Sequence, residues 1–101
     1  MALKRGMPPV HPGEILREDV LPALGLSVVD AAKKLGITRQ TLHRIISHEN
    51  PRPITPEMAV RLGKLVGNGA RLWLSLQNAY DLWHAERCVD TRKIPTLQAA
   101  E

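Results

Sequence analysis

The sequence contains a single cysteine, Cys88, and no phenylalanine. One thiol cannot form an internal disulfide, and the chain has no Cys-x-x-Cys pair with which to hold zinc or carry out redox chemistry. No apolar run approaches the roughly 18 residues that cross a bilayer, and the opening residues lack the apolar core of a secretory signal. These absences exclude a disulfide scaffold and a zinc finger, and they predict a soluble cytoplasmic protein without a membrane partner.

The rest of the composition is that of an ordinary globular domain. Hydrophobic residues make up 44% and charged residues 24% of the 101-residue chain, which places it far from sequences that stay disordered. A chain of this length usually forms one domain. Every periodic segment has a helical period, and no alternating run of β-branched residues between turns occurs. We therefore predict a single all-α domain.

The positive charge is concentrated in one stretch. Five basic residues and one acid lie between positions 33 and 52, a local net charge of +4, whereas the rest of the chain has nine of each. The whole formal excess therefore lies in twenty residues, as expected of a surface that binds a polyanion. A solvated basic face without a partner is the alternative that charge alone leaves open.

Start and stop residues divide the chain into five predicted helices. Serine or threonine at N-cap positions, a proline in a first turn and glycines at helix ends set their bounds. Pro22 should end or kink the first helix. The predicted helices cover residues 13–22, 28–35, 39–48, 56–66 and 70–88, with Ser27, Thr38 and Thr55 as caps and Gly25, Gly36 and Gly67 as stops.

The second and third predicted helices have the features of a helix-turn-helix motif. Only Gly36 and Ile37 separate the end of one helix from the cap of the next, which forces a tight turn. The small residues Ala31 and Ala32 stand where the two helices would approach most closely. Leu35, Ile37, Leu42 and Ile45 are expected to face the core. An ordinary helical hairpin in a small bundle is the alternative.

The third predicted helix carries polar residues on the face opposite its core positions. With Leu42 and Ile45 turned inward, the helical period directs these polar residues outward. Arginine can bind guanine, glutamine can bind adenine, and basic side chains can hold the phosphate backbone. We predict that the major groove of DNA is read by Thr38, Arg39, Gln40, Thr41, His43, Arg44 and Ser47, and that the backbone is contacted by Lys33, Lys34 and Arg52.

The motif and its flanks resemble two known groups of proteins. The motif followed by a fourth helix is similar to the Cro and phage-repressor class of DNA-binding domains, which implies a five-helix Cro-like fold. The flanks resemble the signatures of HigA-type antitoxins over residues 11 to about 87, through His11-Pro12-Gly13-Glu14-Ile15-Leu16 and Trp73-Leu74-Ser75-Leu76-Gln77-Asn78-Ala79-Tyr80-Asp81-Leu82. This resemblance implies a dimeric, nucleoid-associated repressor that binds the palindromic operator of its own operon. It also implies a partner toxin, an RNase that cuts translated mRNA, which the protein neutralises.

All three aromatic residues lie on the last predicted helix. Trp73, Leu76, Tyr80 and Trp83 are spaced three, four and three residues apart, the spacing of a coiled-coil seam. We predict a homodimer contact through these residues, although a domain without phenylalanine also needs core aromatics and Trp73 fits that role. The predicted organisation is a mobile arm over residues 1–10, a helix-turn-helix domain over 11–69, a dimerisation helix of the same domain over 70–88 and a tail over 89–101.

No catalytic or metal site can be assembled from the sequence. It contains no recognisable set of nucleophile, base and orienting acid, and no glycine-rich phosphate loop. His84 and Cys88 lie one helical turn apart, but two ligands do not make a metal site. We therefore expect no enzyme activity, cofactor or metal. Besides an antitoxin, two functions remain open: a stand-alone Cro-like regulator, and a helical adaptor that binds an acidic protein or RNA.

Overall fold

The computed structural model describes residues 8–99, within which all regular structure is helical. The helices are α1 (Pro12–Ile15), the π-helical η1 (Leu16–Val20), α2 (Leu21–Leu24), α3 (Val28–Leu35), α4 (Arg39–Ile45), α5 (Pro56–Val66) and α6 (Ala70–Cys88). Because α1, η1 and α2 follow one another without a break, they form one rod. Residues 8–99 thus form the five helical units that the sequence predicts. Residues 1–7 of the predicted arm and residues 100–101 of the predicted tail lie outside the described residues.

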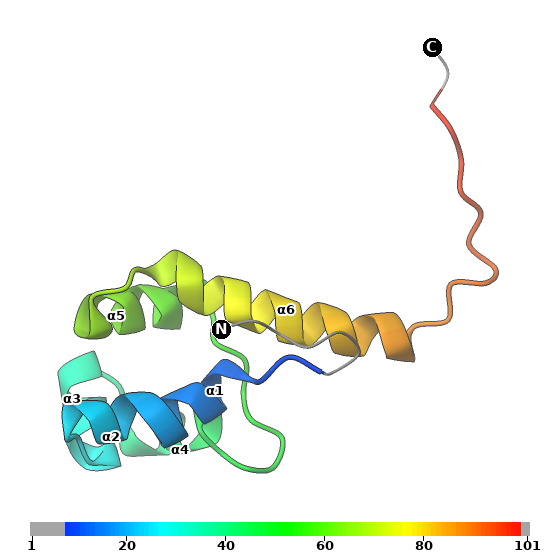
Figure 1. Ribbon diagram of the computed structural model, residues 1–101. Coiled ribbons are helices and arrows are strands. Elements are labelled where there is room, and N and C mark those ends of the chain that lie inside the picture. The colour runs from blue at the N-terminus through cyan, green and yellow to red at the C-terminus, as the bar shows by residue number, and fades with distance from the viewer. Residues whose placement is uncertain (1–7, 100–101) are drawn as a thin grey trace.

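The helices are arranged on two sides of one core (Figure 1). α5 and α6 run along one side, and the rod of α1, η1 and α2 lies opposite them together with α3 and α4. α6 has 19 residues, and its C-terminal half extends beyond the other helices, with residues 89–99 continuing away from the body. Within residues 8–99, no other helix covers the outer half of α6.

Pro22 does not end the first rod, which continues to Leu24 and stops at Gly25 with a left-handed φ of 66°. Pro22 was predicted to end or kink the helix, and an end at this proline is wrong: the helix changes its register just before Pro22 and continues. The Leu21 N–H donates to the Leu16 carbonyl in the wider π-helical pattern. Pro22 then stands in the first turn of α2, directly after this change of register, and it has no N–H to donate to the preceding turn.

The predicted N-caps are confirmed by the hydrogen bonds that they make. The hydroxyl groups of Ser27, Thr38 and Thr55 accept from the backbone N–H three residues later, at Asp30, Thr41 and Met58. Gly36 and Gly67 end α3 and α5 in the left-handed region, as predicted.

The end of α4 differs from the prediction, because the helix stops at Ile45 rather than near His48. Ser47 competes with the helix for the backbone: its hydroxyl donates to the Glu49 carbonyl and accepts from the Glu49 N–H. Asn50 then adopts a positive φ of 48° and turns the chain. The loop returns so that the Arg52 N–H donates to the Arg44 carbonyl at 2.9 Å.

One hydrophobic core joins all five helical units. Each unit contributes buried apolar residues: Leu16, Leu21, Ala31, Ala32, Leu35, Leu42, Ile45, Met58, Ala59, Leu62 and Trp73 are all buried. Val66, at the end of α5, is only partly buried against this core. No helix among residues 8–99 is long and apolar enough to cross a membrane.

Trp73 belongs to this core and not to a dimer contact. Its side chain is 1% exposed, and its Nε1–H donates to Asn68 Oδ1 at 3.0 Å. A side chain that its own chain already covers has no surface left for a second copy. The prediction that Trp73 contributes to dimerisation is therefore wrong, whereas its alternative assignment to the core is right.

Candidate nucleic-acid interface

α3 and α4 form a compact helix-turn-helix pair. Ala31 and Ala32 are buried where the helices meet, and the Ile37 N–H donates to the Ala32 carbonyl across the turn at 3.0 Å. Gly36 makes the turn possible because its φ is 72°. This conformation is unfavourable for any residue that has a side chain. Leu42 and Ile45 pack into the core. The orientation of α4 is thereby set by its buried face.

The outer face of α4 is polar, exposed and not engaged within the chain. Among residues 8–99 no hydrogen bond or ion pair involves the side chains of Arg39, Gln40, His43 or Arg44. All four side chains are exposed, while Leu42 between them is fully buried. This face therefore presents donors and acceptors to an external partner.

Three predicted contact residues already use their hydroxyl groups within the chain. Thr38 Oγ1 accepts from the Thr41 N–H at 3.1 Å and shares a hydrogen bond of 2.8 Å with Thr41 Oγ1. This pair closes the first turn of α4, so its methyl groups are freer than its hydroxyls to meet a base. Ser47 lies beyond the end of the helix and bonds to Glu49. The structure thus places Ser47 beside the exposed polar face of α4 rather than on it.

The predicted backbone-contacting residues lie on both sides of α4. Lys33 and Lys34 occupy the last turn of α3, and Arg52 lies in the loop that follows α4. All three side chains are exposed. Arg52 and Thr41 line one shallow groove between α4 and the start of α5. The three basic residues therefore come from the segments that precede and follow α4, and exposed basic side chains of this kind can contact phosphates.

The residues of the predicted coiled-coil seam on α6 do not all face the same way. The Tyr80 ring packs edge-on against His11 of the same chain, with 4.8 Å between ring centroids, and it also contacts His84. Trp83 is half-buried, and the Arg87 guanidinium lies 3.6 Å from its ring centroid. Apolar residues spaced four, three and four apart share one flank of α6; we call Leu72, Leu76, Ala79 and Trp83 the α6 stripe.

His11 attaches the start of the first rod to α6. Its Nδ1 accepts from the Gly13 N–H at 2.9 Å, and its Nε2 is buried without a hydrogen-bond partner in the described residues. Burial lowers the pKa of His11 below its usual value, although the nearby negative charges of Asp81 and Glu14 partly oppose that shift. Because Nδ1 accepts a hydrogen bond, the proton of a neutral His11 ring lies on Nε2.

One buried and one partly buried polar contact escaped the sequence analysis. Gln77 is 3% exposed, and its Oε1 accepts from the Ile54 N–H at 2.8 Å, which ties the loop before α5 to α6. Arg17 donates from Nη1 to the Ile46 carbonyl just past the end of α4. Gln77 stands four residues after Trp73, on the core face of α6. A polar residue at a core position was therefore the signal that could have predicted a buried hydrogen bond here. Arg17 offered no such signal because its partner is a backbone atom 29 residues away.

The described residues offer no sign of a metal site. Among residues 8–99 no group of three or more histidine, cysteine, aspartate or glutamate side chains could hold a metal ion. The His84 ring packs at an angle against the rings of Tyr80 and Trp83.

Comparison with known proteins relates the chain to DNA-binding proteins. A helix-turn-helix family model matches residues 16–69. Virulence-associated protein I of Dichelobacter nodosus is 43% identical over 84 residues, which are 83% of this chain and 76% of the relative.

Solved structures extend the similarity beyond the motif. Antitoxin GraA in complex with its operator has a TM-score of 0.77 and 35% identity, covering 99% of both chains. Pseudomonas aeruginosa antitoxin HigA with the higBA promoter has a TM-score of 0.74 and 31% identity, covering 88% of this chain and 99% of that one. The resemblance to HigA-type antitoxins predicted from the sequence is thus confirmed.

Proposed function

Because the chain belongs to the helix-turn-helix family, with HigA-type antitoxins among its relatives, we propose that it is an antitoxin that binds operator DNA through α4. The observation that carries this proposal is the exposed and unengaged polar face of α4 above a buried apolar face. The family is one of regulators and antitoxins rather than enzymes, as the sequence predicts.

The residues of the interface divide into two roles. Gln40 and Arg44 have the side chains that bind adenine and guanine bidentately, and Arg39 and His43 lie beside them on the same exposed face. Thr38 and Thr41 offer methyl groups to thymine. Lys33, Lys34 and Arg52 hold the phosphate backbone, which positions the protein but does not specify sequence.

We further propose that the protein has a regulatory role. The protein represses its own toxin-antitoxin operon and neutralises a partner toxin that is an RNase. The similarity to antitoxins solved with a promoter or an operator supports this proposal. Such a protein acts on the chromosome in the cytoplasm. A stand-alone regulator is the second candidate, because one relative is described as an HTH-type transcriptional regulator of Escherichia coli; a neighbouring RNase-like reading frame distinguishes the two.

We propose that two copies associate through the α6 stripe. One helix-turn-helix unit reads few base pairs, so a palindromic operator needs a dimer whose α4 helices lie about one DNA turn apart. Leu72 is 46% exposed, and Trp83 and Ala79 are half-buried on a helix whose outer half no other helix covers. Tyr80 lies only at the edge of this proposed dimer contact, because its ring packs against His11 of the same chain.

Substitutions of a base-reading and a backbone-contacting residue should weaken binding in different ways. Arg44→Ala and Gln40→Ala should each cost about 1 to 3 kcal/mol with the preferred duplex and relax discrimination at one position, because each removes a bidentate base contact. Lys34→Ala should weaken all sequences alike and reduce the salt slope by about one unit.

Titrations of the preferred and a shuffled duplex over a range of salt concentrations measure these effects. Lys34→Ala serves as the control because it removes one positive charge, as Arg44→Ala does, outside the reading face. An unchanged affinity ratio in Arg44→Ala would show that Arg44 does not read bases.

A further inference from the structure

α4 ends without the glycine that terminates other helices of the fold. α2, α3 and α5 stop at Gly25, Gly36 and Gly67, each in the left-handed region. The residue after α4 is Ile46, with φ −94° and ψ 8°. A glycine cap directs backbone N–H groups back to the last carbonyls of its helix. The last carbonyls of α4 therefore depend more on groups from other parts of the chain.

Arg17 from η1 supplies one of these groups. Its Nη1 donates to the Ile46 carbonyl, and its side chain is only 20% exposed. Two acids hold the guanidinium in place: Glu18 accepts from Nε at 2.8 Å, and Glu14 lies 3.9 Å from Nη2. A positive charge at a helix C-terminus also interacts favourably with the helix dipole. Arg17 thus caps α4 from outside.

The neighbouring carbonyls of α4 are also in contact with residues outside the helix. The Arg44 carbonyl accepts from the Arg52 N–H. The Ile45 carbonyl lies so close to Gly13 that a Cβ there would be 1.9 Å from the oxygen. The first rod therefore touches the end of α4 at Gly13 and at Arg17, one turn apart.

These contacts set the direction of a short helix. α4 has seven residues, or about two turns. Its start is held by the Thr38 cap and the tight turn, and its end by Arg17. Base contacts depend on side chains that reach the groove at the correct angle, whereas phosphate attraction tolerates small rotations.

We propose that Arg17 is a positioning residue that sets the tilt of α4, and that it controls base discrimination without touching DNA. This inference rests on the proposed DNA-binding function. It concerns a residue outside the helix-turn-helix motif, in the rod that packs against it.

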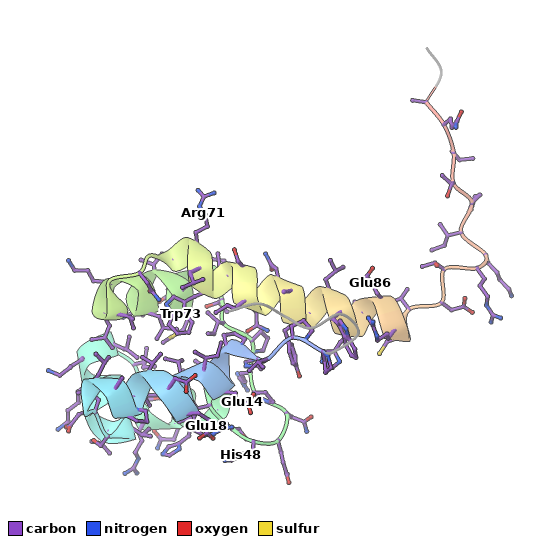
Figure 2. The ribbon with its side chains drawn as sticks, in the orientation of Figure 1. Glu14, Glu18, His48, Arg71, Trp73 and Glu86 are labelled. Carbon is purple, nitrogen blue, oxygen red and sulfur yellow. The ribbon has the colours of Figure 1, made fainter. Side chains whose placement is uncertain are left out.

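Arg17→Gln tests the proposal, with Arg71→Gln as the matched control. Arg71 undergoes the same change of charge, but its side chain is exposed on α6 and points away from the body of the molecule (Figure 2). The probes are the duplex that the wild-type protein selects from a random library and a shuffled duplex of equal length. The ratio of the two affinities is measured at several salt concentrations, below the melting temperature of each variant.

Arg17→Gln should lower the affinity ratio about tenfold, the loss that one poorly read base pair causes. The salt slope should remain that of Arg71→Gln, since neither side chain contacts a phosphate. Arg17→Lys keeps the charge and one donor, so it should recover part of the ratio. In the absence of DNA, amides in the last turn of α4 should exchange faster in Arg17→Gln than in the wild type, while those of α5 should not.

Two results would overturn the positioning role. A lower salt slope with an unchanged ratio would make Arg17 a phosphate contact. A lower melting temperature with an unchanged ratio would make it a structural cap alone. If the wild-type protein selects no sequence, the proposed function itself fails, so the two failures are distinguishable.

Discussion

Replacing Ala79 and Trp83 together by aspartate should separate the dimer into monomers and lower affinity for the preferred duplex by about 100-fold or more, because two half-sites can no longer be engaged together. Both residues lie in the α6 stripe, where aspartate would place charge in a desolvated contact. Affinity for random DNA should fall far less, since it does not depend on the spacing of two half-sites. The double variant spares Leu76, which packs partly against the core of its own chain.

Analytical ultracentrifugation and DNA titration measure this effect. The matched control is Asn78→Asp with Ala85→Asp, which adds the same charges at two exposed positions of α6 that are not three or four residues away from any member of the stripe. The control should remain dimeric with wild-type affinity. A stripe variant that still sediments as a dimer would place the contact elsewhere, and one that loses its helicity would show that these residues stabilise the fold.

Gly13→Ala should destabilise the fold by about 2 kcal/mol and lower the melting temperature by about 10 °C at a fixed protein concentration. The new Cβ would lie 1.9 Å from the Ile45 oxygen and 2.9 Å from its carbon, and both are backbone atoms that cannot move aside. The gain in helix propensity, at most about 1 kcal/mol, is too small to offset this overpacking. The first rod must therefore shift away from the end of α4.

Gly63→Ala is the matched control for this substitution. Its Cβ would also collide with backbone, at 2.5 Å from the Ala70 nitrogen, but this contact lies between α5 and α6. Both variants should melt earlier than the wild type, yet only Gly13→Ala should also lose base discrimination. Thermal unfolding followed by circular dichroism measures the loss of stability. The ratio of affinities for the preferred and the shuffled duplex measures base discrimination. A Gly13→Ala protein as stable as the wild type would contradict the close approach.

Local signals made the helices and the exposed polar face of α4 predictable from the sequence. Ser27, Thr38 and Thr55 cap the helices that they precede, because capping depends on residues within one turn. The same holds for the outward face of α4, which follows from the period set by Leu42 and Ile45. The end of α4 was misjudged because Ser47 bonds to Glu49 instead of continuing the helix.

Contacts between distant segments could not be predicted in the same way. Arg17 binds a backbone carbonyl, and Gly13 is required by a close approach, so neither leaves a pattern in the sequence. Trp73, Leu76, Tyr80 and Trp83 share a coiled-coil spacing. That spacing could not show which of these side chains are covered by the rest of the same chain. The structure resolves this: Trp73 is buried in the core and Tyr80 packs against His11.

The central claim is that the exposed face of α4 reads DNA as part of a dimer. Selection by the wild-type protein from a library of random duplexes tests it most directly, because the selected sequences show both the bases that are read and the spacing of the half-sites. We predict an inverted repeat whose half-site centres lie about 10 base pairs apart, bound at least about 1,000-fold more tightly than shuffled DNA. Recovery of no common sequence, with equal affinity for every duplex, would contradict the claim.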